Sequence, residues 1–263
     1  MTERQETALQ SAWTPTNGCL IYRNWCTYDN DFAKDAVPLA DLVFARYEEL
    51  FGYDSVFGEP CVIINEKSDD YPMLVTNRDP IEIALDTGAG KIGQIVYQFS
   101  HEMMHYVLRQ NRSDKAPALS WFEEPLCEAM SRYMVKYAAE NWRRCALSET
   151  MPDKQKELLD YLEANQEADS SATDELAACK TVEQLRKYEI NRVSENRRSS
   201  HIRERNLLYK TICEDPALLS EIVHYRTHLR PDKITLDLEA WAAAAPDRYA
   251  PLFDALREIQ PIQ

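Results

Sequence analysis

Long apolar runs are missing from this sequence of 263 residues. No stretch approaches the roughly 18 consecutive apolar residues that a membrane-spanning helix needs, so we expect no segment to cross a bilayer. The first six residues, MTERQE, are polar and precede no apolar core. They therefore do not have the pattern of a secretory signal peptide.

Basic residues are few relative to acidic ones. The chain has 30 Lys and Arg against 44 Asp and Glu, which gives a formal net charge of −14. Nucleic acids and anionic membranes attract basic surfaces, so this balance argues against both as partners. One segment around His201 is locally basic. Its arginines could bind an acidic substrate or partner, but we favour a solvent-exposed helix face paired with nearby glutamates. These arginines are Arg192, Arg197, Arg198, Arg203 and Arg205.

Closely spaced cysteine pairs are also missing. The seven cysteines are an odd number, they are scattered, and no two have the Cys-x-x-Cys spacing. This usage predicts reduced thiols in a cytoplasmic protein, with neither a disulfide framework nor a thiolate zinc site. We interpret Cys127 as a small buried apolar side chain.

The most informative stretch that is present is residues 90–108, which contains His101-Glu102-Met103-Met104-His105. Side chains four residues apart on an α-helix lie one turn above each other, so both imidazoles can reach one metal ion. A second stripe, of apolar residues at helical spacing, predicts that another face of this helix lies in a core. This stripe consists of Ile92, Ile95, Val96, Phe99 and Met103.

Glu102 lies about 100° around the helix from His101. There it can meet a metal-bound water without being a ligand itself. A catalytic zinc site has three protein ligands and keeps a fourth position open for water. The two histidines therefore need a third ligand from elsewhere in the chain. Residues 120–131 offer Glu124 and Glu128, which are one helical turn apart.

With a glutamate after His-Glu-x-x-His, the chain resembles the gluzincin metallopeptidases over residues 81–137. The segment Trp121-Phe122-Glu123-Glu124 looks like the W-L-N-E of the aminopeptidase branch. The segment beginning at Glu128, Glu-Ala-Met-Ser, is instead similar to the E-A-x-S of the thermolysin-like branch. Both matches have departures: Pro125 stands where the first pattern has Gly, and Arg132 where the second has Asp.

We favour Glu124 as the third ligand, because its spacing from the second histidine and its Trp-Phe lead-in match the aminopeptidase pattern. Glu128 would then hold a histidine ring from outside the ligand set. The reverse assignment stays open. Pro125 suggests that the helix begins near Glu124, since proline is best tolerated in a first turn. Glu123 is a further candidate for the third ligand, but it is better explained as the capping-box partner of Ser120.

The resemblance implies a zinc peptidase that acts on a peptide or protein substrate. Glu102 would take a proton from a metal-activated water as general base. Gluzincins add a Tyr or His from the later lobe to stabilise the oxyanion, and the candidates here are His224 and Tyr225. The chain has no exopeptidase motif such as G-x-M-E-N, so the position of cleavage stays open. The alternative function is a catalytically silent zinc-binding regulatory or interaction protein with the same fold.

The sequence predicts an α+β fold. A zincin-like lobe, residues 1–112, would hold a small mixed sheet and the active-site helix, and a mostly helical lobe, residues 113–263, would carry the third ligand. By analogy with zincins, residues 81–86 would be an edge strand that binds an extended peptide. The predicted strands are 19–22, 61–64, 73–76 and 81–85, and the predicted helices are 37–51, 90–108, 125–142, 154–167, 174–189, 202–214, 216–228 and 249–259.

Overall fold

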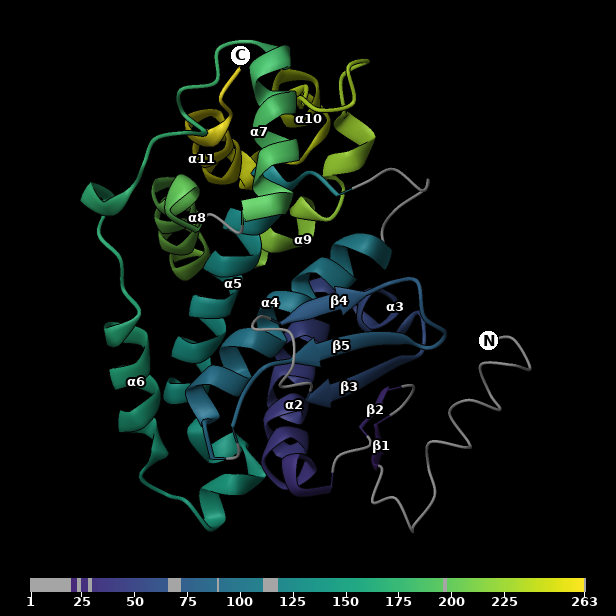
Figure 1. The fold of residues 1–263 in the computed structure, drawn as a ribbon, viewed down its shortest axis with the longest axis vertical. Helices are drawn as coiled ribbons and strands as arrows, with labels where there is room; N and C mark the ends of the chain where they lie inside the picture. Colours follow the sequence, from purple (N-terminus) through teal and green to yellow (C-terminus); the bar gives the residue numbers. More distant parts are fainter. Residues whose placement is uncertain are drawn as a thin grey trace. The chain divides into compact units, whose positions relative to one another are not determined.

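The computed structural model describes residues 20–22, 25–27, 30–65, 72–88, 90–110, 118–195 and 198–262 (Figure 1). The chain divides into two compact units, each built from two separate stretches. The first unit comprises Met1–Gln110 and Met134–Asn165, and the second comprises Asn111–Tyr133 and Gln166–Gln263. The later stretch of the first unit was predicted from sequence to lie in the C-terminal lobe. The fold is α+β, as predicted.

The first unit contains a mixed sheet with the strand order β1-β2-β3-β5-β4. β1 pairs antiparallel with β2, the central strands β2, β3 and β5 run parallel, and β4 pairs antiparallel with β5. The strands are β1 (Leu20–Tyr22), β2 (Trp25–Thr27), β3 (Cys61–Asn65), β4 (Met73–Val75) and β5 (Ile81–Leu85). The predicted strands are thus confirmed to within a residue or two, and β2 is an addition.

The prediction that residues 81–86 form an edge strand is wrong. β5 lies between β3 and β4, with Ile83 paired to Ile63 on one side and to Leu74 on the other. Among the described strands, the edge on this side of the sheet is β4, whose side chains are partly exposed. The cause is the short connection from β4 to β5, which folds β4 back as a hairpin and leaves it outermost.

Helices α2 (Asn30–Phe51), α3 (Tyr53–Phe57) and α4 (Ile92–Gln110) belong to the same unit. α2 begins before the predicted residue 37 and includes Pro38. It ends at Phe51, directly before the predicted stop, Gly52, whose φ of 82° is a left-handed conformation that glycine adopts easily after a helix. Figure 1 shows α2 behind the sheet, and α4 contacts both β4 and β5.

The core of this unit holds α4 in place. Phe99 of α4 meets Phe44 of α2 edge to face, with ring centroids 5.4 Å apart. The hydroxyl of Tyr47 donates to the backbone oxygen of Ser100 at 2.7 Å. On another side α4 packs against α6 (Lys154–Ala164), and a Cβ at Gly93 would lie 2.7 Å from the Tyr161 ring. Glycine at this position therefore allows the close approach of α4 and α6.

The division between the units falls inside α5 (Ser120–Glu140), the longest helix after α2. This helix begins earlier than the predicted residue 125. It also ends earlier than predicted, because Trp142 lies in a separate 3₁₀ turn, η2 (Trp142–Arg144). The second part of α5 belongs to the first unit, where it is followed by η2, η3 (Ala146–Glu149) and α6.

The rest of the second unit is helical, and its described part contains one isolated β-bridge, Leu229 to Leu236, outside any strand. The predicted helix 216–228 is broken into three short pieces, and the predicted helix 174–189 begins at Val182 instead. The elements are η4 (Asp169–Ser171), α7 (Val182–Glu195), η5 (Arg198–His201), α8 (Ile202–Glu214), η6 (Pro216–Leu218), α9 (Leu219–Ile222), η7 (Tyr225–His228), α10 (Leu238–Ala244), η8 (Asp247–Tyr249) and α11 (Ala250–Ile259).

The second unit contains the arginine cluster that the sequence predicted to be a solvent-exposed helix face. Arg205 is only 2% exposed, so the interpretation of the arginine cluster as a solvated face is wrong at this position. Arg203 does fit it, since it is half exposed and pairs with Asp174 at 2.8 Å. The side chains of Arg192, Arg197 and Arg198 lie outside the described residues.

Within the described ranges, no helix combines the length and apolar character that crossing a bilayer requires.

Candidate metal centre

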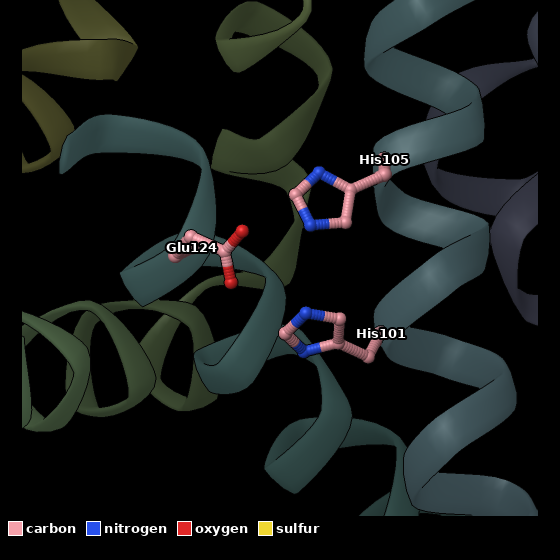
Figure 2. A group of neighbouring side chains, drawn as sticks. All are labelled: His101, His105 and Glu124. Atoms are coloured by element: carbon pink, nitrogen blue, oxygen red, sulfur yellow. The ribbon is translucent and has the colours of Figure 1, made fainter. Parts of the chain in front are cut away.

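The two histidines of the His-Glu-x-x-His motif lie in the middle of α4, on one side of the helix. Their ring centroids are 5.1 Å apart, as expected for side chains one turn apart (Figure 2). The predicted apolar stripe of α4 is confirmed, because all five of its residues are buried. Glu102 is also buried, at 4% exposure. The motif thus presents two imidazoles in register beside an enclosed carboxylate.

The first half of α4 is tied to the end of β5 by amide side chains. The Gln98 amide nitrogen donates to the backbone oxygen of Asp86 at 2.8 Å, and its oxygen accepts from the Asp86 N–H at 3.0 Å. Gln94 donates to the same backbone oxygen at 3.0 Å. Both glutamines lie on the face that also carries His101 and His105. These bonds therefore help to set the rotation of α4 about its axis and the direction in which the histidines point.

Replacing Gln98 by leucine is expected to destabilise the protein by about 1–3 kcal/mol. The change removes both bonds to Asp86 and leaves its backbone groups to be desolvated without that partner. Urea unfolding followed by circular dichroism measures the effect. Gln94→Leu is the control, because it removes one bond at a partly exposed position and should cost less. Equal stability of Gln98→Leu and wild type would contradict this role.

Glu124 lies near the start of α5, and the start of this helix is not what the sequence predicted. Ser120 lies inside the helix, and its N–H donates to the carboxylate of Glu189 at 3.0 Å. The Trp121 N–H donates to the same carboxylate at 2.5 Å. The predicted capping box, in which Glu123 would accept from the Ser120 N–H, is therefore wrong. A carboxylate on α7 caps the helix instead, which allows it to begin upstream of Pro125.

Glu124 forms a group with the two histidines. One ligand atom of each residue, His101, His105 and Glu124, lies within 4.8 Å of the other two. Ligand atoms about 2.1 Å from one tetrahedrally coordinated ion would be roughly 3.4 Å apart, a separation that lies within this 4.8 Å limit. Two imidazoles and a carboxylate are a known ligand set of catalytic zinc sites. By donor chemistry and by spacing, the residues fit zinc.

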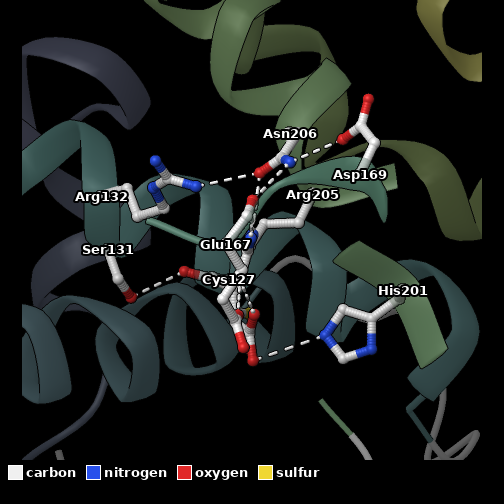
Figure 3. Close-up of polar contacts among 9 residues, drawn as sticks. Cys127, Ser131, Arg132, Glu167, Asp169, His201, Arg205 and Asn206 are labelled. Atoms are coloured by element: carbon white, nitrogen blue, oxygen red, sulfur yellow. Dashed lines mark hydrogen bonds and ion pairs between the residues drawn. The ribbon is translucent and has the colours of Figure 1, made fainter. Parts of the chain in front are cut away.

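Glu128, the other predicted ligand candidate, lies in a different environment. Its buried carboxylate is 3.4 Å from His201 Nε2 and 3.4 Å from Arg205 Nη1 (Figure 3). Arg205 also pairs with Glu167 at 2.7 Å. The histidine ring that Glu128 contacts here is His201 of η5, whereas the expected ring was that of a metal-ligating histidine. Burial of a carboxylate is tolerated here because a guanidinium and an imidazole surround it.

Arg132, which stands where the thermolysin-like pattern has Asp, belongs to the same polar network as Glu128 and Arg205. Asn206 Oδ1 accepts from Arg132 Nη1 at 2.9 Å and from Arg205 Nη2 at 3.0 Å (Figure 3). The Arg132 guanidinium also lies over the ring of Tyr209, 4.6 Å from its centroid. Arg132 is therefore part of the packing of the second unit.

The two predicted oxyanion candidates differ in exposure. His224 is exposed and precedes η7, so the expectation that it lies within a regular helix is wrong. Tyr225 is fully buried, its ring packs on Phe122 with centroids 4.7 Å apart, and its hydroxyl donates to Glu123. Neither residue belongs to the group of three possible ligands among the described residues.

Two residues that contact the first turn of α5 were not predicted from the sequence. Glu189 caps α5, and Arg226 contacts Glu123 Oε1 at 3.0 Å. No local signal identifies Glu189, because the helix that it caps begins 69 residues earlier in the chain. For Arg226, the signal in the sequence was its position directly after Tyr225, which was itself a predicted site residue.

A separate cavity of about 730 Å³ lies in the second unit. Its lining includes Arg132, Asn206 and Tyr209 but none of the three possible metal ligands. Glu204 also lines it, and burial raises the pKa of this carboxyl. The cavity therefore does not include the metal group.

Comparison of the chain with protein-family models gave no match, and comparisons with curated proteins and with solved structures also gave none.

Proposed function

We propose that this protein is a zinc-dependent peptidase of the gluzincin type, with a first unit equivalent to the zincin lobe. His101, His105 and Glu124 would hold the metal. One observation carries the proposal: the ligand atoms of two histidines one turn apart and of a downstream glutamate lie within 4.8 Å of one another. The position of Glu102 in the motif supports an enzyme, because a site that only stores metal has no need of an acid there.

The chemistry follows from the donor set and from Glu102. When bound, zinc lowers the pKa of water towards about 7 and polarises a substrate carbonyl. Glu102 takes the proton of the attacking water as general base and passes it to the leaving amine as general acid. Its burial on α4 restricts the directions in which its carboxylate can turn.

The substrate would be a peptide or protein in extended form. β4, and not β5, is the strand that we propose for pairing with it, since β4 is the described edge strand that contacts α4. An edge strand offers unpaired backbone groups to an extended peptide. The short length of β4, three residues, suits a limited stretch of backbone pairing.

Cleavage of a fluorogenic peptide library is the experiment that tests the proposal. Zinc-loaded protein should cleave at least part of the library, and a zinc chelator should abolish the cleavage. Restoration by added zinc would exclude a contaminating serine or cysteine peptidase. Zinc binding without cleavage of any peptide would favour the alternative, a silent zinc-binding regulatory protein.

The assignment of the third ligand is tested by two matched substitutions. Glu124→Gln is expected to lower zinc affinity by more than about 100-fold, because it removes one of three protein ligands. Glu128→Gln is expected to lower it by no more than roughly 10–100-fold, the usual effect of a group outside the ligand set. Competition with a chromophoric chelator measures both. If the ranking of the two variants is reversed, Glu128 is the ligand.

A further inference from the structure

The first turns of α5 are held by contacts from three other segments of the second unit. The Glu189 carboxylate caps the N–H groups of Ser120 and Trp121. The indole nitrogen of Trp121 donates to the backbone oxygen of Ile234 at 2.8 Å. Glu123 is fully buried, and its Oε1 accepts from Arg226 Nη2 at 3.0 Å and from the hydroxyl of Tyr225.

The partners of Glu123 are themselves fixed. The Tyr225 ring lies against Phe122, and the Arg226 guanidinium lies 5.1 Å from the centroid of the Tyr225 ring. Their 3₁₀ turn, η7, is anchored at its end by His228, whose ring stacks on Trp241 at 5.1 Å. The Trp241 indole in turn donates to Glu221 at 2.7 Å. η7 is therefore a firm support for Glu123.

Glu123 directly precedes Glu124, so holding one of them orients the other. Their side chains leave the helix about 100° apart, and any rotation of α5 moves both. A carboxylate roughly 6 Å from the helix axis shifts by about 1 Å for a rotation of 10°. Metal sites require ligand distances correct to about 0.2 Å. Small rotations of this helix end would therefore displace Glu124 from a ligand position.

We propose that Tyr225 and Arg226 are positioning residues for the third metal ligand. By binding Glu123, they hold α5 in the rotation that points Glu124 at the metal. This inference rests on the proposed function, in which Glu124 binds zinc. It also gives Tyr225 a role other than oxyanion stabilisation, because its single hydroxyl proton is donated to Glu123.

Tyr225→Phe tests the proposal with a minimal change. We expect its zinc dissociation constant, measured with zinc ions and a chromophoric chelator, to rise by roughly 10–100-fold. Once saturated with zinc, the variant should keep a kcat close to that of wild type. Tyr249→Phe is the matched control, because Tyr249 is a buried tyrosine of the same unit whose hydroxyl lies 2.9 Å from Ser220 Oγ. The control should bind zinc as wild type does.

A double-mutant cycle separates positioning from a general loss of structure. If Tyr225 acts through Glu124, adding Tyr225→Phe to Glu124→Gln should not lower the residual zinc affinity further. Equal losses in both backgrounds would overturn the proposal. Unchanged zinc affinity in Tyr225→Phe would also overturn it, and a fall in kcat alone would assign Tyr225 to the oxyanion.

Arg226 gives a second, independent pair of variants. Arg226→Met leaves the buried Glu123 without its guanidinium, so the double substitution Glu123→Gln with Arg226→Met is the version expected to fold. This double variant should bind zinc more weakly than wild type. The single variant Arg226→Lys, which keeps a positive charge, should have a zinc affinity between those of the double variant and wild type. No difference between the double variant and wild type overturns the role of Arg226. If wild-type protein binds no zinc, the proposed function fails. If wild-type protein binds zinc and the variants bind it equally well, only the positioning role fails.

Discussion

His101→Ala is expected to leave the purified protein with less than about one tenth of an equivalent of zinc, whereas wild type should carry close to one. The loss is large because the group has three possible protein ligands, and the variant keeps only His105 and Glu124. Two protein ligands rarely hold zinc through purification. Elemental analysis of protein prepared without added metal measures the ratio directly.

His224→Ala is the matched control for this result. It removes the same side chain from an exposed position that does not belong to the metal group. It should therefore retain the zinc content of wild type, and the circular dichroism of both variants should report intact helices. Full zinc retention in His101→Ala would show that the metal site is not at α4.

Glu102→Gln is expected to keep zinc and fold but to lose hydrolytic activity by roughly 10²–10⁴-fold, the usual contribution of a positioned general base. The amide has nearly the size and shape of the carboxylate, so the buried position should accept it. It has no basic oxygen that can take the proton of the attacking water. The rate of cleavage of a fluorogenic peptide, compared at equal zinc occupancy, gives the effect.

The control for Glu102→Gln is Glu140→Gln, the same chemical change at the exposed end of α5. It should cleave the peptide at the wild-type rate. If Glu102→Gln also did so, the general-base role would be wrong, although the metal ligands would be unaffected by that result.

Local patterns were enough to predict most of the elements that carry the site. The spacing of Ile92, Ile95, Val96 and Phe99 predicted α4, and all four side chains are buried. β5 was predicted with its observed bounds from a five-residue run of alternating character. The one-turn separation of His101 and His105 follows from helix geometry alone. Each of these features depends on residues within a few positions of one another.

The start of α5 shows where local rules are overridden. Pro125 and the sequence after it predict a helix that begins near Glu124, and a capping box would make Ser120 the residue before the helix. The Glu189 carboxylate binds two N–H groups at the helix end and makes an earlier start favourable. A carboxylate from another helix satisfies these donors just as a local cap would, and no pattern near residue 120 indicates it.

By itself, the sequence determined the α+β class, the helix of the His-Glu-x-x-His motif and the two acidic candidates for a third ligand. Only the tertiary structure decided that β4 is the edge strand, that Glu128 lies with His201 and Arg205, and that Glu124 lies with the two histidines. The reason is physical: periodicity records which face of an element is buried, because burial acts on each residue separately. Which elements then become neighbours depends on contacts between residues far apart in the chain, such as Glu128 and Arg205, and these leave no local pattern.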